Sequence, residues 1–335
     1  MAGALYACAN LGTAVNRERI HVLIPIYNDW SVVRLLLLEL DRVLATNRLT
    51  ADIVLVDDGS TIRPDTFDCP ALLAATSVNI LELRRNLGPQ RAIAVGLTFL
   101  HRRMKPDVVV VMDGDGEDAP SDVPRLLAKL RDEDYRKIVF AERTRRSESL
   151  VFKVSYRLYQ LLHVILVGHW VRVGSFSAVP SVILSRLVVI SEMWNHYAAA
   201  VYNARIEFTT VPTSRGKRLG GQSHMNFVSL VVHGLSALSL YGPIIGVRML
   251  VAIAVLVGAV GAGLVAMMIL ALSGTRLPSW LPGLAALLIV LLFQGVTAAV
   301  ASVFLMLSGR QGASVIPLRD YRHFVIRLVC VAPRP

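Results

Sequence analysis

The chain has 335 residues, of which 54% are hydrophobic and 18% charged, so it is long enough for one large domain and more apolar than ordinary soluble proteins. Residues 151–335 hold 15 of the 35 basic residues but only 3 of the 24 acidic ones, which places the net charge of +11 in that half. Because the same half carries long apolar segments, we expect anionic lipid headgroups as its partner rather than nucleic acid, and three widely spaced cysteines favour neither a disulfide framework nor a zinc site.

The first half of the chain alternates apolar runs with helical stretches. Residues 1–19 lack a basic start followed by an apolar run, so no cleaved signal peptide is expected. The apolar runs predict buried strands at Ile20–Ile26, Ala51–Val56, Asn79–Leu83, Val108–Met112 and Lys137–Ala141. Between them we predict helices at Val32–Ala45, Gln90–Arg103 and Asp122–Leu130, with Ser31 and Ser121 as N-caps. This alternation predicts an α/β domain with a mostly parallel sheet, covered by helices on both faces.

Polar residues follow the end of each of the first four predicted strands. Ligands of such sheets bind at the carboxyl ends of the strands, so this edge is the expected site. Asp57 and Asp58 end the second strand and are suited to a base amide and to ribose hydroxyls. Arg84, Arg85 and Arg91 surround the end of the third strand and are suited to phosphate oxygens. The glycine-rich signatures of dinucleotide oxidoreductases and P-loop enzymes do not occur, which argues against both classes.

The sequence Asp113-Gly114-Asp115 directly follows the valine-rich fourth strand and is the central chemical signal. Two carboxylates one residue apart on a loop can bind one hard cation that also binds a diphosphate. Glu117 and Asp118 add further oxygen ligands nearby. A divalent cation there would stabilise the charge of a departing nucleoside diphosphate.

Two long uncharged runs, Met249–Leu272 and Leu281–Leu307, follow the predicted domain. Each exceeds the roughly 20 residues that a helix needs to cross a bilayer, so we predict two transmembrane helices. Small residues four apart, such as Ala254 and Gly258, allow close packing with each other or with another copy of the chain.

Charges around the two runs predict their orientation. Arg248 lies before the pair and Arg310, Arg319 and Arg322 lie after it, whereas the connector carries only Arg276. The positive-inside rule then places both termini and the catalytic domain in the cytoplasm, in a multi-pass protein of the inner membrane.

Four motifs in order resemble those of family 2 glycosyltransferases with the GT-A fold. They are Ile24-Pro25-Ile26-Tyr27-Asn28, Val56-Asp57-Asp58-Gly59-Ser60, Arg85-Asn86-Leu87-Gly88 and Met112-Asp113-Gly114-Asp115. The later part resembles the polyprenyl-phosphate branch, which includes dolichol-phosphate mannose synthases and bactoprenol glucosyltransferases. There an arginine-rich segment, a loop like Arg215-Gly216-Lys217 to Gly221-Gln222-Ser223, a juxtamembrane helix and two spans follow in this order.

The resemblance implies an inverting hexosyl transfer from a UDP- or GDP-linked sugar to a membrane polyprenyl phosphate, with Mg²⁺ or Mn²⁺. The site residues expected for the donor are Pro25, Tyr27, Asn28, Asp57, Asp58, Arg85, Asn86, Gly88, Arg91 and Asp113. Asp113 and Asp115 are the expected metal ligands, and Asp115, Glu192 and Arg143 the expected catalytic residues. The acceptor phosphate is expected at Arg143, Arg145, Arg146 and Lys153.

One position departs from the branch, whose members often read Gly-Asp-Phe where this chain has Gly174-Ser175-Phe176. The family aspartate is a proposed base, and serine cannot replace it in that role. A phosphate acceptor has a second pKa near 6 and needs no base, whereas a hydroxyl acceptor needs one, for which Glu192 is the candidate. The alternatives are therefore transfer to the hydroxyl of another lipid or lipid-linked glycan, or a catalytically degenerate membrane scaffold. The Gln-x-x-Arg-Trp motif of processive synthases is absent.

The sequence thus predicts five parts. They are an N-terminal segment (1–19), a cytosolic GT-A domain (20–222), a juxtamembrane interfacial helix (223–243), a membrane hairpin (244–308, spans 249–272 and 281–307) and a cytosolic tail (309–335). Asn226–Tyr241 and Leu150–Val167 are the candidate interfacial helices. The sequence leaves open the sugar, the nucleotide, the lipid and the oligomeric state.

Overall fold

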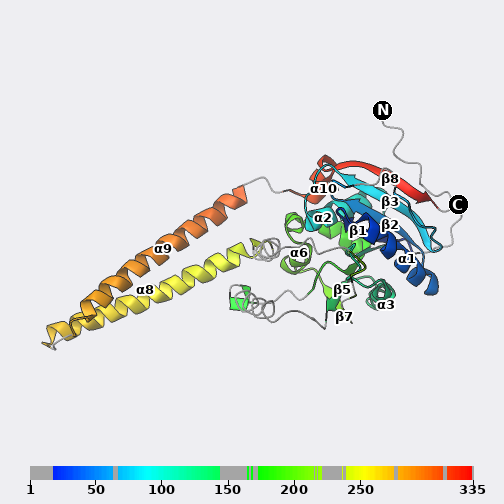
Figure 1. The fold of residues 1–335 in the computed structure, drawn as a ribbon. Helices are drawn as coiled ribbons and strands as arrows, with labels where there is room; N and C mark the ends of the chain where they lie inside the picture. Colours follow the sequence, from blue (N-terminus) through cyan, green and yellow to red (C-terminus); the bar gives the residue numbers. More distant parts are fainter. Residues whose placement is uncertain are drawn as a thin grey trace. The chain divides into compact units, whose positions relative to one another are not determined.

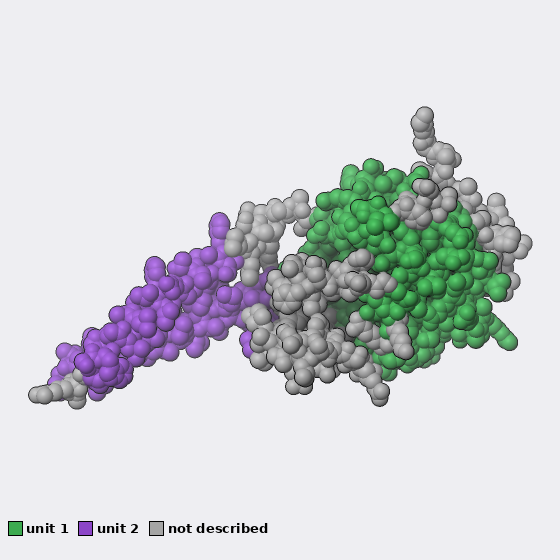
Figure 2. Space-filling model, in the orientation of Figure 1, with its two compact units in different colours: residues 1–153, 171–240, 315–335 green, residues 154–170, 241–314 purple. Residues whose placement is uncertain are grey.

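The computed structural model describes residues 18–62, 67–143, 164–165, 167–168, 173–214, 216, 218–220, 236, 239–274, 278–311 and 315–333. The chain divides into two compact units (Figure 2). Unit 1 comprises residues 1–153, 171–240 and 315–335, and unit 2 comprises residues 154–170 and 241–314. Residues that come before the segment 241–314 in the sequence and residues that come after it therefore both belong to unit 1.

Unit 1 is built on an eight-stranded mixed sheet (Figure 1). Its strands are β1 (Ile20–Ile26), β2 (Ala51–Asp57), β3 (Ala75–Leu83), β4 (Val108–Val111), β5 (Ile138–Arg143), β6 (Ser177–Pro180), β7 (Phe208–Thr213) and β8 (Val325–Pro333). Their order in the sheet is β7-β5-β6-β4-β1-β2-β3-β8. The central strands pair in parallel, whereas β6 and β8 pair antiparallel with their neighbours, so the predicted mostly parallel sheet is confirmed.

Helices cover both faces of the sheet because its strands are apolar on both sides. The helices and helical turns of unit 1 are α1 (Trp30–Thr46), α2 (Pro89–Phe99), η1 (Leu100–Met104), η2 (Pro120–Asp122), α3 (Val123–Asp132), α5 (Ser181–Leu187), η3 (Ser191–Trp194), α6 (Tyr197–Asn203), α10 (Pro317–Asp320) and η4 (Tyr321–His323). Val22 and Ile24 belong to one buried cluster with Leu36 of α1 and Leu126 of α3. On the opposite face, Gly96 of α2 packs so closely on Leu23 that an added Cβ would lie 2.6 Å from its Cδ1.

The helix starts differ from the sequence predictions. The N-cap of α1 is Asp29, whose carbonyl oxygen accepts a hydrogen bond from the amide of Val33, so Ser31 lies inside the helix. The helix starts earlier because Trp30 is buried and joins the core. Ser121 is likewise not an N-cap, since it lies in η2, and Asp122 precedes α3.

Strand β8 is an element that the sequence analysis did not predict. It pairs antiparallel with β3 from Ser77 opposite Pro333 to Leu83 opposite Val325. Arg327 of β8 also forms an ion pair with Glu82 of β3, with 2.9 Å between Nε and Oε2. The tail that follows the two apolar helices is thus part of the sheet of unit 1.

Unit 2 contains two long apolar helices, α8 (Gly242–Leu272) and α9 (Leu281–Gln311), which contact each other. Gly242–Leu272 and Leu281–Phe304 are long and apolar enough to cross a membrane. These two segments contain almost all residues of the two predicted spans. Helix α8 begins seven residues before the predicted span, and Arg248 is the only charged residue in that additional stretch. The two candidate interfacial helices lie almost wholly outside the described residues.

Candidate active site

The carboxyl ends of β1, β2, β3, β4 and β5 meet at one edge of the sheet (Figure 1). The loops that leave these ends carry the predicted donor and metal residues. They approach one another closely: a Cβ added to Gly114 would lie 3.1 Å from the carbonyl oxygen of Pro25 at the end of β1. The structure therefore brings the first and fourth sequence motifs together.

The acidic loop after β4, residues 113–118, is held in shape by its own carboxylates. The amide of Asp113 donates to Oδ2 of Asp118 over 2.9 Å, and the amide of Glu117 donates to Oδ1 of Asp115 over 2.9 Å. Ser175 donates its hydroxyl to Oδ1 of Asp113 over 3.1 Å. The serine that stands where the family often has aspartate therefore lies directly against the acidic loop.

Burial, together with the neighbouring carboxylates, raises the pKa values of Asp113 and Asp115. Burial, and then the negative charges of Asp118 and Asp115, raise the pKa of Asp113 to about 7. Burial is also the main cause of a raised pKa for Asp115. Such a site binds a positive charge favourably, because a cation relieves the repulsion between the carboxylates.

Two arginines lie at this acidic loop. Arg143, at the end of β5, forms an ion pair with Asp118, with 2.9 Å between Nη2 and Oδ1. Arg218 approaches Asp115, with 3.5 Å between Nη1 and Oδ2. Arg143 was predicted as a site residue, whereas Arg218 was not assigned, although the basic loop that contains it was noted.

The described parts of the segment after β7 pack closely on the acidic loop. The amide of Leu219 donates to the carbonyl oxygen of Asp115 over 3.1 Å, and that of Gly216 to the carbonyl oxygen of Glu117 over 2.9 Å. A Cβ at Gly216 would lie 2.5 Å from the carbonyl oxygen of Gly116, so only glycine fits this backbone approach. This packing fixes the position of Arg218 beside Asp115.

The chemistry of these donors fits a cation that is shared with a substrate. Among the described residues, no three His, Cys, Asp or Glu side chains gather to hold a metal ion by themselves. Mg²⁺ is usually bound by one or two carboxylates together with substrate phosphates and water. Asp113 and Asp115 match that arrangement, with a diphosphate needed to complete the coordination.

The loop after β2 is joined to the loop after β1. Ser60 donates its amide to Oδ1 of Asp57 over 2.9 Å, and its hydroxyl oxygen accepts from the amide of Asn28 over 2.9 Å. Asn28 has a φ of 60°, and its Oδ1 accepts from the amide of Ile62 over 2.9 Å. Asp57 and Asn28 therefore shape the donor edge, while Tyr27 beside them is half-buried.

Asp58 connects β2 to the loop after β3. Its two carboxylate oxygens accept from the amides of Leu87 and Gly88 over 2.7 and 2.8 Å. Burial raises the pKa of Asp58 to about 6, although these two hydrogen bonds act in the opposite direction. Gly59 is packed against the same loop, where a Cβ would lie 2.6 Å from the carbonyl carbon of Arg85. The second and third motifs thus form one rigid surface.

That surface carries the predicted phosphate-binding side chains. Arg85 and Asn86 are exposed, and Gly88, with a φ of 89°, precedes the first turn of α2. Arg91 lies in that turn and is exposed. An exposed helix N-terminus with arginines around it is suited to an anion.

The remaining predicted residues are Glu192, Arg145, Arg146 and Lys153. Glu192 is in η3, and its carboxylate accepts from Ser191 and Asn203 over 2.9 and 3.4 Å. These two partners belong to the same segment as Glu192, not to the acidic loop. Arg145, Arg146 and Lys153 lie outside the described residues.

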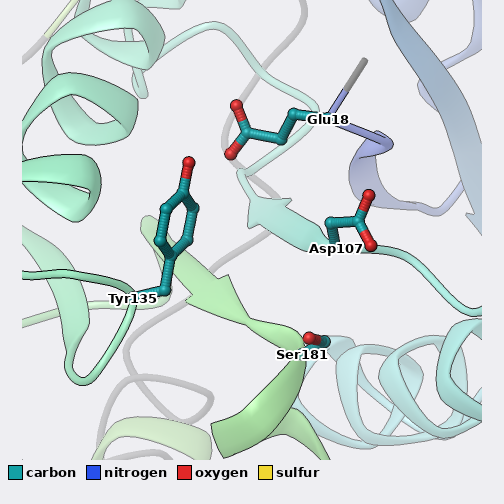
Figure 3. A pocket seen from close by; sticks show the side chains of 4 residues that line it. All are labelled: Glu18, Asp107, Tyr135 and Ser181. Carbon is teal, nitrogen blue, oxygen red and sulfur yellow. The ribbon is translucent and has the colours of Figure 1, made fainter. Parts of the chain in front are cut away.

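A pocket of about 310 Å³ lies at the opposite edge of the sheet, lined by Glu18, Asp107, Tyr135 and Ser181 (Figure 3). Glu18 is paired with Arg131 and Asp107 with Arg19, at 2.6 and 3.1 Å. Both acidic side chains of this pocket precede the amino ends of strands, Glu18 before β1 and Asp107 before β4, so the pocket is separate from the loops that carry the predicted donor and metal residues.

Comparison with known proteins gives three findings. The model of "Glycosyl transferase family 2" matches residues 21–197. An "Undecaprenyl-phosphate 4-deoxy-4-formamido-L-arabinose transferase" of Klebsiella pneumoniae subsp. pneumoniae is 32% identical over 146 residues, which is 43% of each chain. A protein of the same description from Salmonella choleraesuis is 31% identical over 147 residues, again 43% of each chain. The match thus spans less than half the length of these relatives.

A solved structure shares the fold. The crystal structure of glucosyl-3-phosphoglycerate synthase from Mycobacterium tuberculosis, in complex with Mn²⁺, UDP-glucose and phosphoglyceric acid, superposes with a TM-score of 0.50 and 15% identity. The superposition covers 68% of this chain and 80% of that one. At this identity the likeness concerns the fold alone.

Proposed function

The chain belongs to glycosyl transferase family 2, and on that basis we propose that it transfers a sugar from a nucleoside diphosphate to a polyprenyl phosphate in a membrane. The observation that carries this proposal is the arrangement of Asp113 and Asp115 at the end of β4, with Arg218 beside them, in a chain with two long apolar helices. The names of the relatives from Klebsiella and Salmonella support a polyprenyl phosphate as the acceptor.

The donor occupies the loops at the carboxyl edge. Asp57 and the backbone around Asn28 receive the nucleoside, and Arg85 and Arg91 receive its phosphates. Asp113 and Asp115 would hold Mg²⁺ or Mn²⁺, which would supply positive charge to the departing diphosphate. Arg218 is already beside Asp115, at 3.5 Å, and can transfer its hydrogen bonds to a phosphate oxygen as the diphosphate arrives.

The acceptor supplies its own nucleophile. A phosphate monoester is largely a dianion at neutral pH because its second pKa is near 6. One of its oxygens forms a bond to the anomeric carbon while the bond from that carbon to the diphosphate oxygen breaks, and the electron pair leaves with the nucleoside diphosphate. Attack from the opposite face inverts the configuration. Arg143, with Arg145, Arg146 and Lys153 after it, would bind the acceptor phosphate.

The role of Ser175 follows from this mechanism. Its hydroxyl donates to Asp113 and therefore orients a metal-binding carboxylate instead of accepting a proton. A phosphate acceptor makes a base unnecessary, so the serine is compatible with transfer. For a hydroxyl acceptor, Glu192 would have to approach the acidic loop, whereas its hydrogen bonds tie it to its own segment.

The test uses the purified full-length protein with a panel of radiolabelled UDP- and GDP-sugars, Mg²⁺ and polyprenyl phosphate. We expect one donor to give label in the organic phase, dependent on the polyprenyl phosphate. The variant Asp113→Asn serves as the matched control, which should give no labelled lipid. Label that enters lipid only when polyprenyl phosphate is replaced by diacylglycerol would contradict the proposed acceptor.

A further inference from the structure

Arg91 combines a position that repels a cation with a charge attraction to Asp58, whose pKa it helps to lower. It is in the first turn of α2, where the partial positive charge of a helix N-terminus repels a cation. In the described part of the chain no carboxylate forms an ion pair with it, and its side chain is exposed. A site of this kind is stabilised when an anion binds.

The guanidinium of Arg91 rests on an aromatic side chain. Its Cζ lies 5.6 Å from the centre of the Trp194 ring, within the range of a cation–π interaction. A contact of this kind does not require the N–H groups of the guanidinium as hydrogen-bond donors to the ring. Those groups can then bind two oxygens of one phosphate.

Trp194 is in turn held by the C-terminal tail. Its ring centre lies 4.7 Å from that of Phe324, with 40° between the ring planes. Phe324 immediately precedes β8, and its carbonyl oxygen accepts from the amide of Arg84 over 2.8 Å. The stack therefore joins η3, the tail and the loop after β3.

The tail around Phe324 is itself fixed. Tyr321 is buried, and the amide of Leu318 donates to the carbonyl oxygen of Val188 over 2.9 Å. Strand β8 then pairs along β3. In Figure 1, α10 and β8 accordingly lie beside α2 and β3, and contacts between α10 and α2 agree with that view.

We propose that Trp194 and Phe324 are positioning residues that hold the guanidinium of Arg91 ready for a phosphate of the donor diphosphate. The donor is favoured over the acceptor because Arg91 follows Gly88, whose amide is bonded to Asp58 at the donor edge. This inference rests on the proposed function, and it gives the tail after the membrane helices a part in substrate binding.

The test measures binding of UDP and of GDP to the full-length protein by calorimetry, with Mg²⁺ present. For the nucleotide that the wild type binds, Trp194→Leu should weaken affinity about 2- to 5-fold, the range expected of an exposed cation–π contact. Trp194→Phe, which keeps an aromatic face, should recover most of the loss. Phe324→Leu should also weaken nucleotide affinity. Phe324→Tyr, which keeps an aromatic ring, should bind the nucleotide about as tightly as the wild type.

A double-mutant comparison separates positioning from general stability. In an Arg91→Gln background, Trp194→Leu should have no further effect on affinity, because the tryptophan acts through the arginine. An equal loss in both backgrounds would overturn the proposal. The proposal would also be overturned if Trp194→Leu left nucleotide affinity unchanged and raised the KM for the acceptor. That result would assign Arg91 to the acceptor phosphate. A wild type that binds neither nucleotide would overturn the proposed function as well.

Discussion

At the scale of single residues, the acidic loop after β4 dominates the candidate site. Asp113 and Asp115 accept hydrogen bonds from Ser175 and from the amide of Glu117, which an asparagine oxygen can still accept, and burial is the main cause of their raised pKa values. We expect Asp113→Asn and Asp115→Asn to lower kcat/KM at least about 100-fold, because charge stabilisation of the leaving group is lost. Thermal unfolding in detergent should stay close to that of the wild type. Turnover near the wild-type value at limiting Mg²⁺ would contradict the metal site.

Glu192 provides a second prediction at this scale. If the acceptor phosphate is its own nucleophile, Glu192→Gln should change kcat only slightly, since the amide keeps the shape of the side chain. If a hydroxyl is the acceptor and Glu192 its base, the loss should be on the order of 10² to 10⁴. Measuring kcat with polyprenyl phosphate separates the two mechanisms. Asn203→Leu, which removes the hydrogen bond to Glu192 without adding a charge, is the matched control for a purely structural effect.

Asp58 gives a pH prediction. Burial raises its pKa to about 6 in the folded protein, whereas an unfolded aspartate has a value near 3.9. The folded state therefore holds the proton more tightly, so the contribution of Asp58 to stability falls as pH rises from about 4 to 6 and is constant above that. A ¹³C titration of the Asp58 carboxyl, without substrates, should have its midpoint near 6. A midpoint near 4 would contradict the raised value.

At the scale of elements, β8 is the part of the fold with the clearest consequence. It covers the edge of β3 from Ser77 to Leu83, and Phe324 precedes it. Removing residues 315–335 would expose the unpaired amides and carbonyls of β3 and free Trp194. We expect the melting temperature to fall by at least about 5 °C and the protein to aggregate more readily.

A shorter truncation controls for the loss of the C-terminus itself. Removal of residues 334–335 leaves β8 complete and should unfold as the wild type does. A protein without 315–335 that unfolds at the wild-type temperature would show that the antiparallel strand contributes nothing to stability.

At the scale of the whole molecule, the sheet constrains the path of the chain. Strands β1 to β3 come before α8 and α9, and β8 comes after them, yet all four belong to one sheet. If the two helices cross a membrane, they must cross it as a pair, so that both ends return to the same side. The arginines that flank the helices predict that this side is the cytoplasm.

Cysteine labelling in cells tests this topology. With Cys8, Cys69 and Cys330 replaced by serine, a new cysteine at Ser273 in the connector should react with a membrane-impermeant maleimide in intact cells. One at Ser308, beyond the second candidate span, should react only after the membrane is opened. Labelling of both positions in intact cells would contradict the predicted orientation.

The sequence alone determined the alternation of strands and helices from Ile20 to Ala141 and the two long apolar helices. Ile20–Ile26 and Val108–Val111 are continuous apolar runs, so their burial follows from local composition. The position of Asp113 and Asp115 shortly after the second run is likewise evident from the sequence. The two long apolar helices are equally local, since their length and lack of charge mark them as candidate membrane spans.

Only the tertiary structure decided which distant residues meet. Arg218 reaches Asp115, and Phe324 reaches Trp194, across more than a hundred residues in each case, and no local pattern encodes those contacts. Strand β8 is rich in β-branched residues, so its sequence favours a strand, but its place beside the free edge of β3 depends on pairing with a distant segment. The helix caps differ from prediction for the same reason: burial of Trp30 starts α1 before Ser31 because core packing outweighs a single cap.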